Sequence, residues 1–127
     1  MFRRRNLLLD VSKKTLKEGH LGFKPAKGDT VTVHCTGMLT SKDRKKFWST
    51  RDTNQPFSFM VDGGQVIKGW DKGLKMMSLN EIAEIEISGG DGYGKQGFPT
   101  WGIGPFEVLT FEIELLEIQR VGAKSGM

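Results

Sequence analysis

The chain is poor in the residues that most often build disulfides and metal sites. It has one cysteine, Cys35, and two histidines, His20 and His34, in 127 residues. A single cysteine cannot form an intrachain disulfide, which fits a reducing compartment. The two histidines are far apart in the sequence and have no second cysteine beside them, so a zinc site is not expected. We expect neither a metal nor any other cofactor.

Long apolar runs are also missing. The longest aliphatic run, Leu7 to Leu9, is far too short to span a membrane. Three arginines precede it, but no small-residue cleavage site follows where a secretory signal would have one. These features predict a protein of the cytoplasm, with the nucleus as a second location, and no membrane association.

Positive charge is scarce in the body of the chain and concentrated at its start. Residues 1–27 hold eight Lys and Arg against Asp10 and Glu18, whereas residues 28–127 hold eleven against thirteen acidic residues. The N-terminal arginines could touch nucleic acid or acidic lipid, or serve as a nuclear address. A solvated tail is the more common outcome for such a segment, so a nucleic-acid partner is not expected.

The usual motifs of covalent and nucleotide chemistry are absent as well. No Ser or Cys sits in a nucleophile elbow, and Cys35 shares a strand face with Val33, as a buried thiol would. Gly92-x-Gly94-x-x-Gly97 matches the dinucleotide fingerprint. A helix must follow that fingerprint to bind phosphate, and the prolines and glycines after Gly97 forbid one.

Alternating apolar and polar residues predict a mostly β chain. Val31, Val33 and Cys35 share one face of a strand, and Thr32, His34 and Thr36 share the other. One wet face per strand is typical of antiparallel sheets. The last strand should turn Leu109, Phe111 and Ile113 inward, and Thr110, Glu112 and Glu114 outward. Strands are expected at 6–11, with 15–18 continuing it or pairing beside it, and at 30–39, 46–49, 81–88 and 108–118. A loop at 51–56 leads into a further, aromatic strand that begins at Phe57 and precedes the Gly63-Gly64 turn.

Two further segments organise this sheet. Trp70, Leu74 and Met77 recur at helical spacing, which predicts one short helix and an α+β domain. The glycines within this helix make it weak on its own, so it must be held by packing. Residues 89–107 form a long Gly- and Pro-rich segment whose aromatic residues, Phe106 among them, favour a flap packed over a site. Ten of the twelve aromatic residues fall between Phe47 and Phe111, enough to line a dry pocket, although a plain core is the commoner use of such residues.

Several runs of residues, in one collinear register over about residues 16 to 119, resemble the FKBP family of peptidyl-prolyl cis–trans isomerases. They are Val31-Thr-Val-His-Cys-Thr-Gly-Met-Leu39, Lys46-Phe-Trp-Ser-Thr-Arg-Asp52, Pro56-Phe-Ser-Phe59, Val66-Ile-Lys-Gly-Trp-Asp71, Gly92-Tyr-Gly94 and Leu109-Thr-Phe-Glu-Ile-Glu-Leu115. The small single-domain members of plants are the most similar. The resemblance implies a twisted antiparallel sheet of about five strands wrapped around one short helix. We assign residues 1–15 to a basic extension, 16–119 to the isomerase domain and 120–127 to a flexible tail.

The resemblance also implies a pocket for the proline ring of a substrate. Trp70 would be its floor, and Tyr93 and the Ile67 backbone N–H would donate hydrogen bonds to substrate carbonyls. The residues that the resemblance assigns to catalysis are Phe47, Trp70, Tyr93 and Phe111. Those that it assigns to binding are Cys35, Trp48, Phe57, Gln65, Val66, Ile67, Phe98, Trp101 and Ile103.

Three positions depart from the family pattern: Cys35 replaces a common Tyr, Trp48 replaces the usual Asp, and Phe98 replaces a common His. We expect a monomeric enzyme that acts on Xaa–Pro polypeptides and binds FK506-like macrolides with weakened affinity. Trp48 could instead turn outward and leave the pocket untouched. A binding module for Pro-containing segments, with little turnover, is the alternative function.

Overall fold

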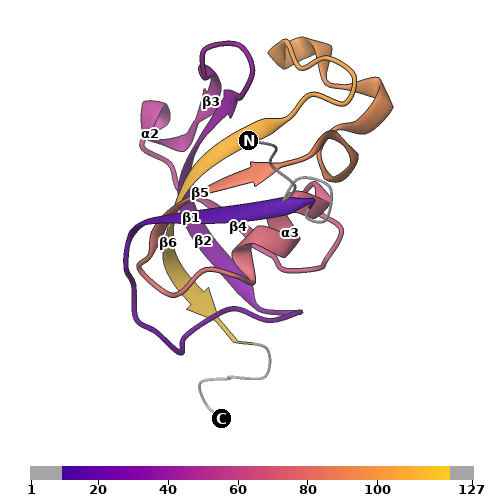
Figure 1. Cartoon of the computed structure of the whole chain (residues 1–127). Helices are drawn as coiled ribbons and strands as arrows, with labels where there is room; N and C mark the ends of the chain where they lie inside the picture. Colours follow the sequence, from indigo (N-terminus) through magenta and orange to yellow (C-terminus); the bar gives the residue numbers. More distant parts are fainter. Residues whose placement is uncertain (1–9, 121–127) are drawn as a thin grey trace, which may run out of the picture.

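A computed structural model of the chain describes residues 10–120 as an antiparallel sheet wrapped around one short helix (Figure 1). The tail expected beyond Arg120, and residues 1–9 of the expected basic extension, lie outside the described residues. No helix within residues 10–120 is both long and apolar enough to cross a membrane.

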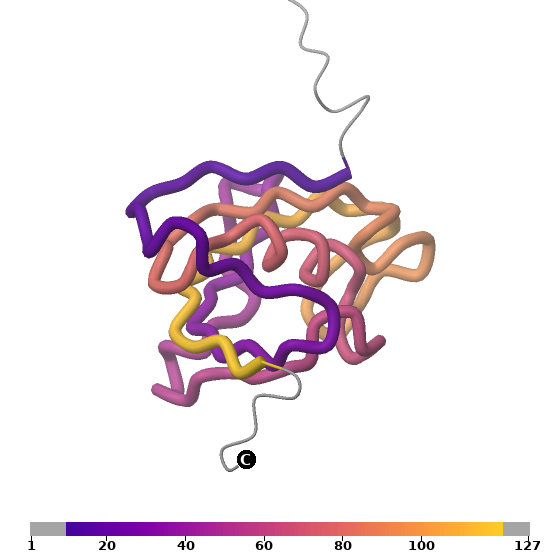
Figure 2. The backbone as a smooth tube through the Cα atoms, turned by 90° about the horizontal axis from the view of Figure 1, so that it is seen from below, coloured from indigo at the N-terminus to yellow at the C-terminus, as the bar shows by residue number. Residues whose placement is uncertain are grey.

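The sheet has six strands arranged in five rows. Its order is β1-β5-β6-β2-β3, and β4 also pairs with β2. The first residues of β2 pair with β4 and the last with β3, so these two short strands share one row, and about five expected strands become six. The α+β antiparallel fold is confirmed. The strands are β1 (Val11–Lys17), β2 (Thr30–Leu39), β3 (Lys45–Ser49), β4 (Phe57–Met60), β5 (Ile82–Ile87) and β6 (Leu109–Gln119). Figure 2 shows β1, in indigo, along one border of the molecule.

Alternation gives the sheet two unlike faces. We call the face toward the helix the inward face and the opposite one the outward face. Val31, Val33 and Cys35 of β2 are buried on the inward face, and Ala83 and Ile85 of β5 join them. The predicted period of two is therefore confirmed on these strands.

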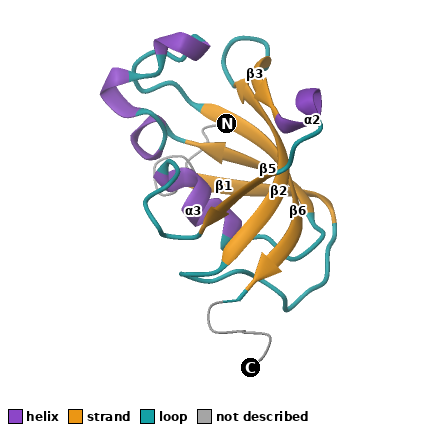
Figure 3. Ribbon diagram, turned by 180° about the vertical axis from the view of Figure 1, so that it is seen from behind, coloured by secondary structure: helices purple, strands orange, loops and turns teal. Residues whose placement is uncertain are grey.

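The helix α3 (Lys68–Leu74) lies against the inward face beside β5 (Figure 3). Two glycines permit this approach: a Cβ on Gly69 would lie 2.3 Å from Ile87 Cγ2, and one on Gly73 would lie 2.8 Å from Ile85 Cγ2. Trp70 and Leu74 are buried in the same core. Packing thus holds a helix of low intrinsic propensity, as expected.

At the start of the chain, the expected piece at 15–18 continues the first strand, and only the predicted gap between the two pieces was wrong. One strand, β1, runs from Val11 to Lys17 across the expected break, because it pairs continuously with β5 from Val11↔Ile87 to Thr15↔Ala83. The sheet therefore includes residues that we had assigned to the N-terminal extension. The part of the predicted first strand that falls on residues 6–9 lies outside the described residues.

Two smaller predictions were also wrong. The expected loop at 51–56 begins with a helical turn, α2 (Thr50–Thr53), because the Ser49 side chain caps it by accepting the Arg51 N–H. Thr110 was expected to face water, but it is buried and its hydroxyl forms a 2.7 Å hydrogen bond with that of Thr40.

The β2–β3 hairpin and the flap rise from the same end of the sheet (Figures 1 and 3). The flap, residues 89–107, contains three 3₁₀ turns, Gly89–Asp91, Gly94–Gln96 and Pro99–Trp101, and no α-helix. The rejection of a dinucleotide site is consistent with this path. Phe106 was expected to be buried, but it is 59 % exposed, because its backbone adopts φ 53° while its N–H bonds the Gly94 carbonyl.

Candidate functional site

An aromatic pocket opens between the flap, the helix and the inward face of the sheet. Its volume is about 220 Å³, and among its lining residues only Tyr93 is ionisable. We call it the proline pocket, after the ligand that the resemblance implies. It is lined by Trp48, Phe57, Gln65, Val66, Ile67, Trp70, Tyr93, Trp101 and Phe111, all of them predicted from the sequence.

Trp70 occupies the centre of this pocket. It is 3 % exposed, and its ring centroid lies 5.3 Å from that of Phe111 and 5.8 Å from that of Phe57, both edge to face. Phe59 packs behind it at 5.5 Å. Edge-to-face pairs are a favoured arrangement of aromatic rings, so neighbouring strands hold the Trp70 indole in one orientation.

Trp48 turns into the pocket and not outward. Its ring stacks on Trp101 of the flap with centroids 5.6 Å apart and planes 13° apart, and it lies 6.1 Å from Trp70. Trp48 therefore joins the hairpin side of the pocket to the flap side. An indole can donate a hydrogen bond but cannot accept one, so the pocket has no carboxylate at this position.

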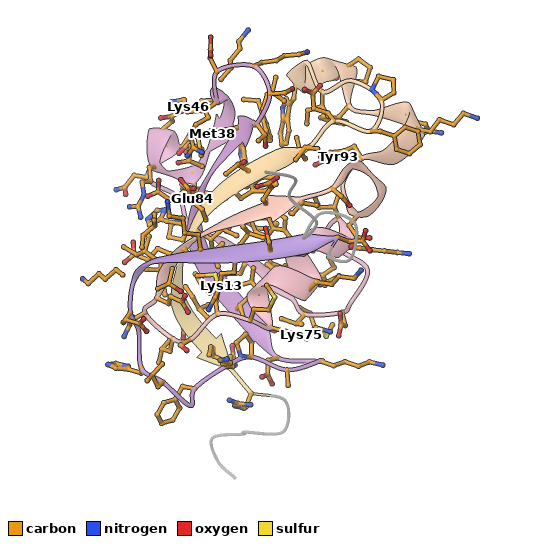
Figure 4. The ribbon with its side chains drawn as sticks, in the orientation of Figure 1. Lys13, Met38, Lys46, Lys75, Glu84 and Tyr93 are labelled. Carbon is orange, nitrogen blue, oxygen red and sulfur yellow. The ribbon has the colours of Figure 1, made fainter. Side chains whose placement is uncertain are left out.

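Two hydrogen-bond donors at the pocket have no acceptor within residues 10–120: the Ile67 backbone N–H and the Tyr93 hydroxyl. Figure 4 shows Tyr93 at the base of the flap. Burial raises the pKa of Tyr93 above its usual value, so the hydroxyl stays protonated at neutral pH. Both groups can donate to the carbonyl oxygens of a bound ligand.

Four predicted site residues lie behind the lining and not on it. Phe47 packs on Trp101 at 5.4 Å and on Phe111 at 5.8 Å, and Phe98 stacks on Tyr93 at 5.3 Å. These two rings support the lining side chains. The other two, Cys35 and Ile103, are buried in the core.

Cys35 has no features of a reactive thiol. Burial raises its pKa to about 12, and the charge of Arg51 offsets this only in part. A thiol of that pKa is neutral at pH 7 and a poor nucleophile.

The flap is tied to the hairpin at its base and shaped by one obligatory glycine. The Glu107 carboxylate accepts the Gly104 N–H at 3.0 Å and lies 3.6 Å from the Lys42 ammonium; these contacts hold its pKa below the usual value. Gly97 has φ 62°, and a Cβ there would lie 2.4 Å from the Ile103 carbonyl oxygen. Only glycine fits that position without displacing the flap.

A larger hollow of about 820 Å³ lies along β1, but its lining is mostly charged. Ion-pairing lysine, arginine and glutamate side chains such as Arg44 and Glu84 occupy it. Within residues 10–120, no group of three or more His, Cys, Asp or Glu side chains could hold a metal ion. The proline pocket is therefore the better candidate for binding an uncharged group.

Sequence reasoning missed one feature beside this pocket: the lysines of residues 42–46 adjoin its Trp101 wall. The sequence analysis predicted no functional role for this segment. Its unbroken run of charged residues was the one available signal.

Comparison of the sequence with those of known proteins identifies the family of this chain. Residues 22–116 match the family model described as FKBP-type peptidyl-prolyl cis-trans isomerase. The chain is 50 % identical to the peptidyl-prolyl cis-trans isomerase FKBP12 of Arabidopsis thaliana over 113 residues, which cover 87 % of this chain and all of that protein. Its identity to FKBP12 of Vicia faba is 48 % over the same coverage. A fungal relative, FK506-binding protein 1 of Yarrowia lipolytica, is 43 % identical over 87 % of this chain and 99 % of its own length. The chain belongs to the family of FKBP-type peptidyl-prolyl cis-trans isomerases.

Proposed function

We propose that the proline pocket is where this isomerase binds the proline ring of an Xaa–Pro segment and lets the preceding amide rotate. The observation that carries the proposal is a pocket of about 220 Å³ that the buried Trp70 helps to line and in which no lining side chain carries a charge at neutral pH. A proline ring is compact and apolar, so it suits such a lining. Phe57, Val66 and Phe111 form the walls.

Rotation about the Xaa–Pro bond needs no covalent step. The barrier of an amide, about 18–20 kcal/mol, comes from the double-bond character of its C–N bond. In the twisted state this resonance is lost and the carbonyl is less polar than in the planar amide. An apolar pocket therefore binds the twisted state better than the planar one, which is the requirement for catalysis. An acceleration of roughly 10⁶ asks for about 8 kcal/mol of such preference.

Two donors would orient the substrate. The Ile67 N–H and the Tyr93 hydroxyl, both without an acceptor in the described part of the chain, would bond carbonyl oxygens on either side of the proline. Phe47, Phe98 and Ile103 would act indirectly, by supporting the lining side chains. Cys35 would contribute only to the core beneath them.

An isomerase assay on short peptides with leucine or phenylalanine before proline tests the proposal. We expect turnover well above the uncatalysed rate, and loss of most of it in Trp70→Leu. Full turnover in a folded Trp70→Leu variant would show that Trp70 is not the floor. Tight binding of the peptide without turnover would favour the second candidate, a binding module for Pro-containing segments. The absence of a carboxylate in the lining is the observation that favours that candidate.

We also propose that the pocket binds FK506-like macrolides, but more weakly than a pocket with aspartate at the Trp48 position. Such an aspartate could accept a hydrogen bond from the ligand, and a charge-assisted bond is worth about 1.5–3 kcal/mol. Trp48→Asp should therefore gain about ten- to a hundredfold in macrolide affinity, measured by calorimetric titration. Unchanged macrolide affinity in a folded variant would show that the residue at position 48 does not affect binding.

The remaining proposals concern context. We propose that the protein is a monomer of the cytosol, with the nucleus as a second location. A single, buried cysteine supports a reducing compartment. Sedimentation velocity and imaging of a fluorescent fusion would test the two statements separately.

A further inference from the structure

A second hollow adjoins the proline pocket on the far side of Trp101. Its volume is about 280 Å³, and we call it the basic pocket, because the only charged side chains of its lining are three lysines. Leu39, Phe47, Thr100, Trp101 and Gly102 complete the lining with Lys42, Lys45 and Lys46. Figure 4 shows Lys46 on the hairpin, across from the flap.

The two pockets share Trp101 as a common wall. One side of the Trp101 ring stacks on Trp48 at 5.6 Å, and Phe47 packs against it at 5.4 Å. The wall is therefore about as thick as a row of three rings. An extended peptide advances about 3.3 Å per residue, so a chain seated in the proline pocket crosses the two centroid spacings of 5.6 and 5.4 Å within about three to four residues.

The lysines of the basic pocket are not fully neutralised by the protein. Lys46 pairs with Asp52 at 2.9 Å and Lys42 with Glu107 at 3.6 Å, and neither acid belongs to the lining. Both lysine side chains remain about half exposed. Lys45 is exposed and has no ion-pair or hydrogen-bond partner for its side chain within residues 10–120. A positive potential therefore faces the space beside the proline pocket.

We infer that the basic pocket is a substrate subsite that receives an anionic side chain about three to four residues from the isomerised proline. This rests on the proposed function of the proline pocket, and it narrows the substrates to acidic Xaa–Pro segments. The carboxylate or phosphoryl group meets the three lysines, while Leu39 and Phe47 contact its aliphatic stem. Aspartate, glutamate and phosphoserine share this chemistry.

Matched peptides test the inference. Each carries Glu, Gln or phosphoserine three or four residues before or after the proline, and rates are measured by NMR exchange spectroscopy, which needs no protease. At ~10 mM salt the Glu peptide of at least one position should be isomerised about three- to fivefold more efficiently than its Gln partner, the range of an exposed ion pair. At ~1 M salt this ratio should approach one. A phosphoserine peptide that exceeds the Glu peptide identifies a phosphorylated source, and equality identifies a carboxylate.

Charge reversal locates the effect. In Lys45→Glu the Glu-to-Gln ratio should fall below one, and in Lys45→Gln it should approach one. The control is Lys17→Glu, an equal charge change at an exposed position of β1, which should keep the wild-type ratio. Equal rates for Glu and Gln peptides at every position, or a ratio that Lys45→Glu does not change, would overturn the inference. Absence of turnover for every peptide would instead overturn the proposed function.

Discussion

The two faces of the sheet are made from the same strands but carry opposite chemistry. On β5, Ala83 and Ile85 are fully buried inward, while Glu84 between them faces outward and lies directly across from Glu112 of β6. Arg44 pairs with Glu84, and Arg51 with Glu114 at 2.6 Å, on this outward face. Exposed ion pairs of this kind contribute little, whereas buried apolar side chains contribute much. The comparison teaches that stability and the uncharged pocket both come from the inward face.

The largest effect should follow from emptying the inward face at Trp70. Trp70→Ala should lower the free energy of unfolding by about 3–5 kcal/mol, because a large buried aromatic ring leaves a cavity. Urea denaturation measures the change. A loss below about 1 kcal/mol would mean that the pocket floor is not part of the core.

A pair of neighbours on β2 compares the faces directly. Gly37 faces inward, and a Cβ there would lie 2.6 Å from Phe47 Cζ and 2.8 Å from Phe111 Cε1. Gly37→Ala should therefore cost about 1–3 kcal/mol and reduce turnover, because it displaces rings that support the pocket. Thr36→Ala, on the outward face, removes one hydroxyl bond to Ser49 and should cost about 0.5–1.5 kcal/mol with turnover intact. Equal losses of turnover in the two variants would contradict the claim that only the inward face supports the pocket.

A buried carboxylate at the border of the inward face should give the pH dependence. Burial acts to raise the pKa of Glu81, but hydrogen bonds from Thr15, the Ser78 N–H and Lys13 outweigh it, so the pKa lies below its usual value. The unfolded chain then binds the proton more readily. The stabilisation is present above the unfolded pKa, near 4.3, and is lost as the pH falls through the lower folded pKa.

Glu81→Gln should accordingly cost about 1–2 kcal/mol near pH 7, and the difference from wild type should shrink below about pH 4. Unfolding curves from pH 3 to 7 measure it. A difference that stays constant over this range would show that the charge of Glu81 is not what stabilises the fold.

The smallest effect is expected on the outward face. Arg51→Ala removes the ion pair with Glu114, whose side chains are 49 % and 29 % exposed, and should change stability by about 0.2–1 kcal/mol. Raising the salt concentration should remove even that difference. A loss above about 2 kcal/mol would mean that the outward face stabilises the sheet as much as the inward one.

Much of this architecture could be predicted from the sequence, because alternating apolar and polar residues indicate directly which face of a strand is buried. The strands at 30–39 and 81–88 follow from this alternation. The same alternation does not indicate which strands pair with each other. The sequence therefore left open whether the piece at 15–18 continues the first strand or pairs beside it, and the pairing of β1 with β5 decides for one strand.

The site was predictable where a residue type determines its place, and not where tertiary contact does. A large apolar side chain such as Trp70 is most stable when it is buried, so its residue type predicts a place in the core. The orientation of Trp48 depends on its contact with Trp101, which is fifty-three residues away in the sequence. Phe47 lies behind the pocket lining because it packs against the same Trp101 ring. The meeting of the lysines at 42–46 with the flap is likewise a contact between distant segments.

The tryptophan arrangement has a spectroscopic consequence. The chain has three tryptophans, and all three line the proline pocket. Its intrinsic fluorescence therefore originates almost entirely from the site, so a bound peptide or macrolide is reported by the protein's own emission, without a label. Because the Trp48 and Trp101 rings are nearly parallel at 5.6 Å, their excited states are coupled. Circular dichroism in the indole bands can then follow the seating of the flap on the hairpin independently of the emission.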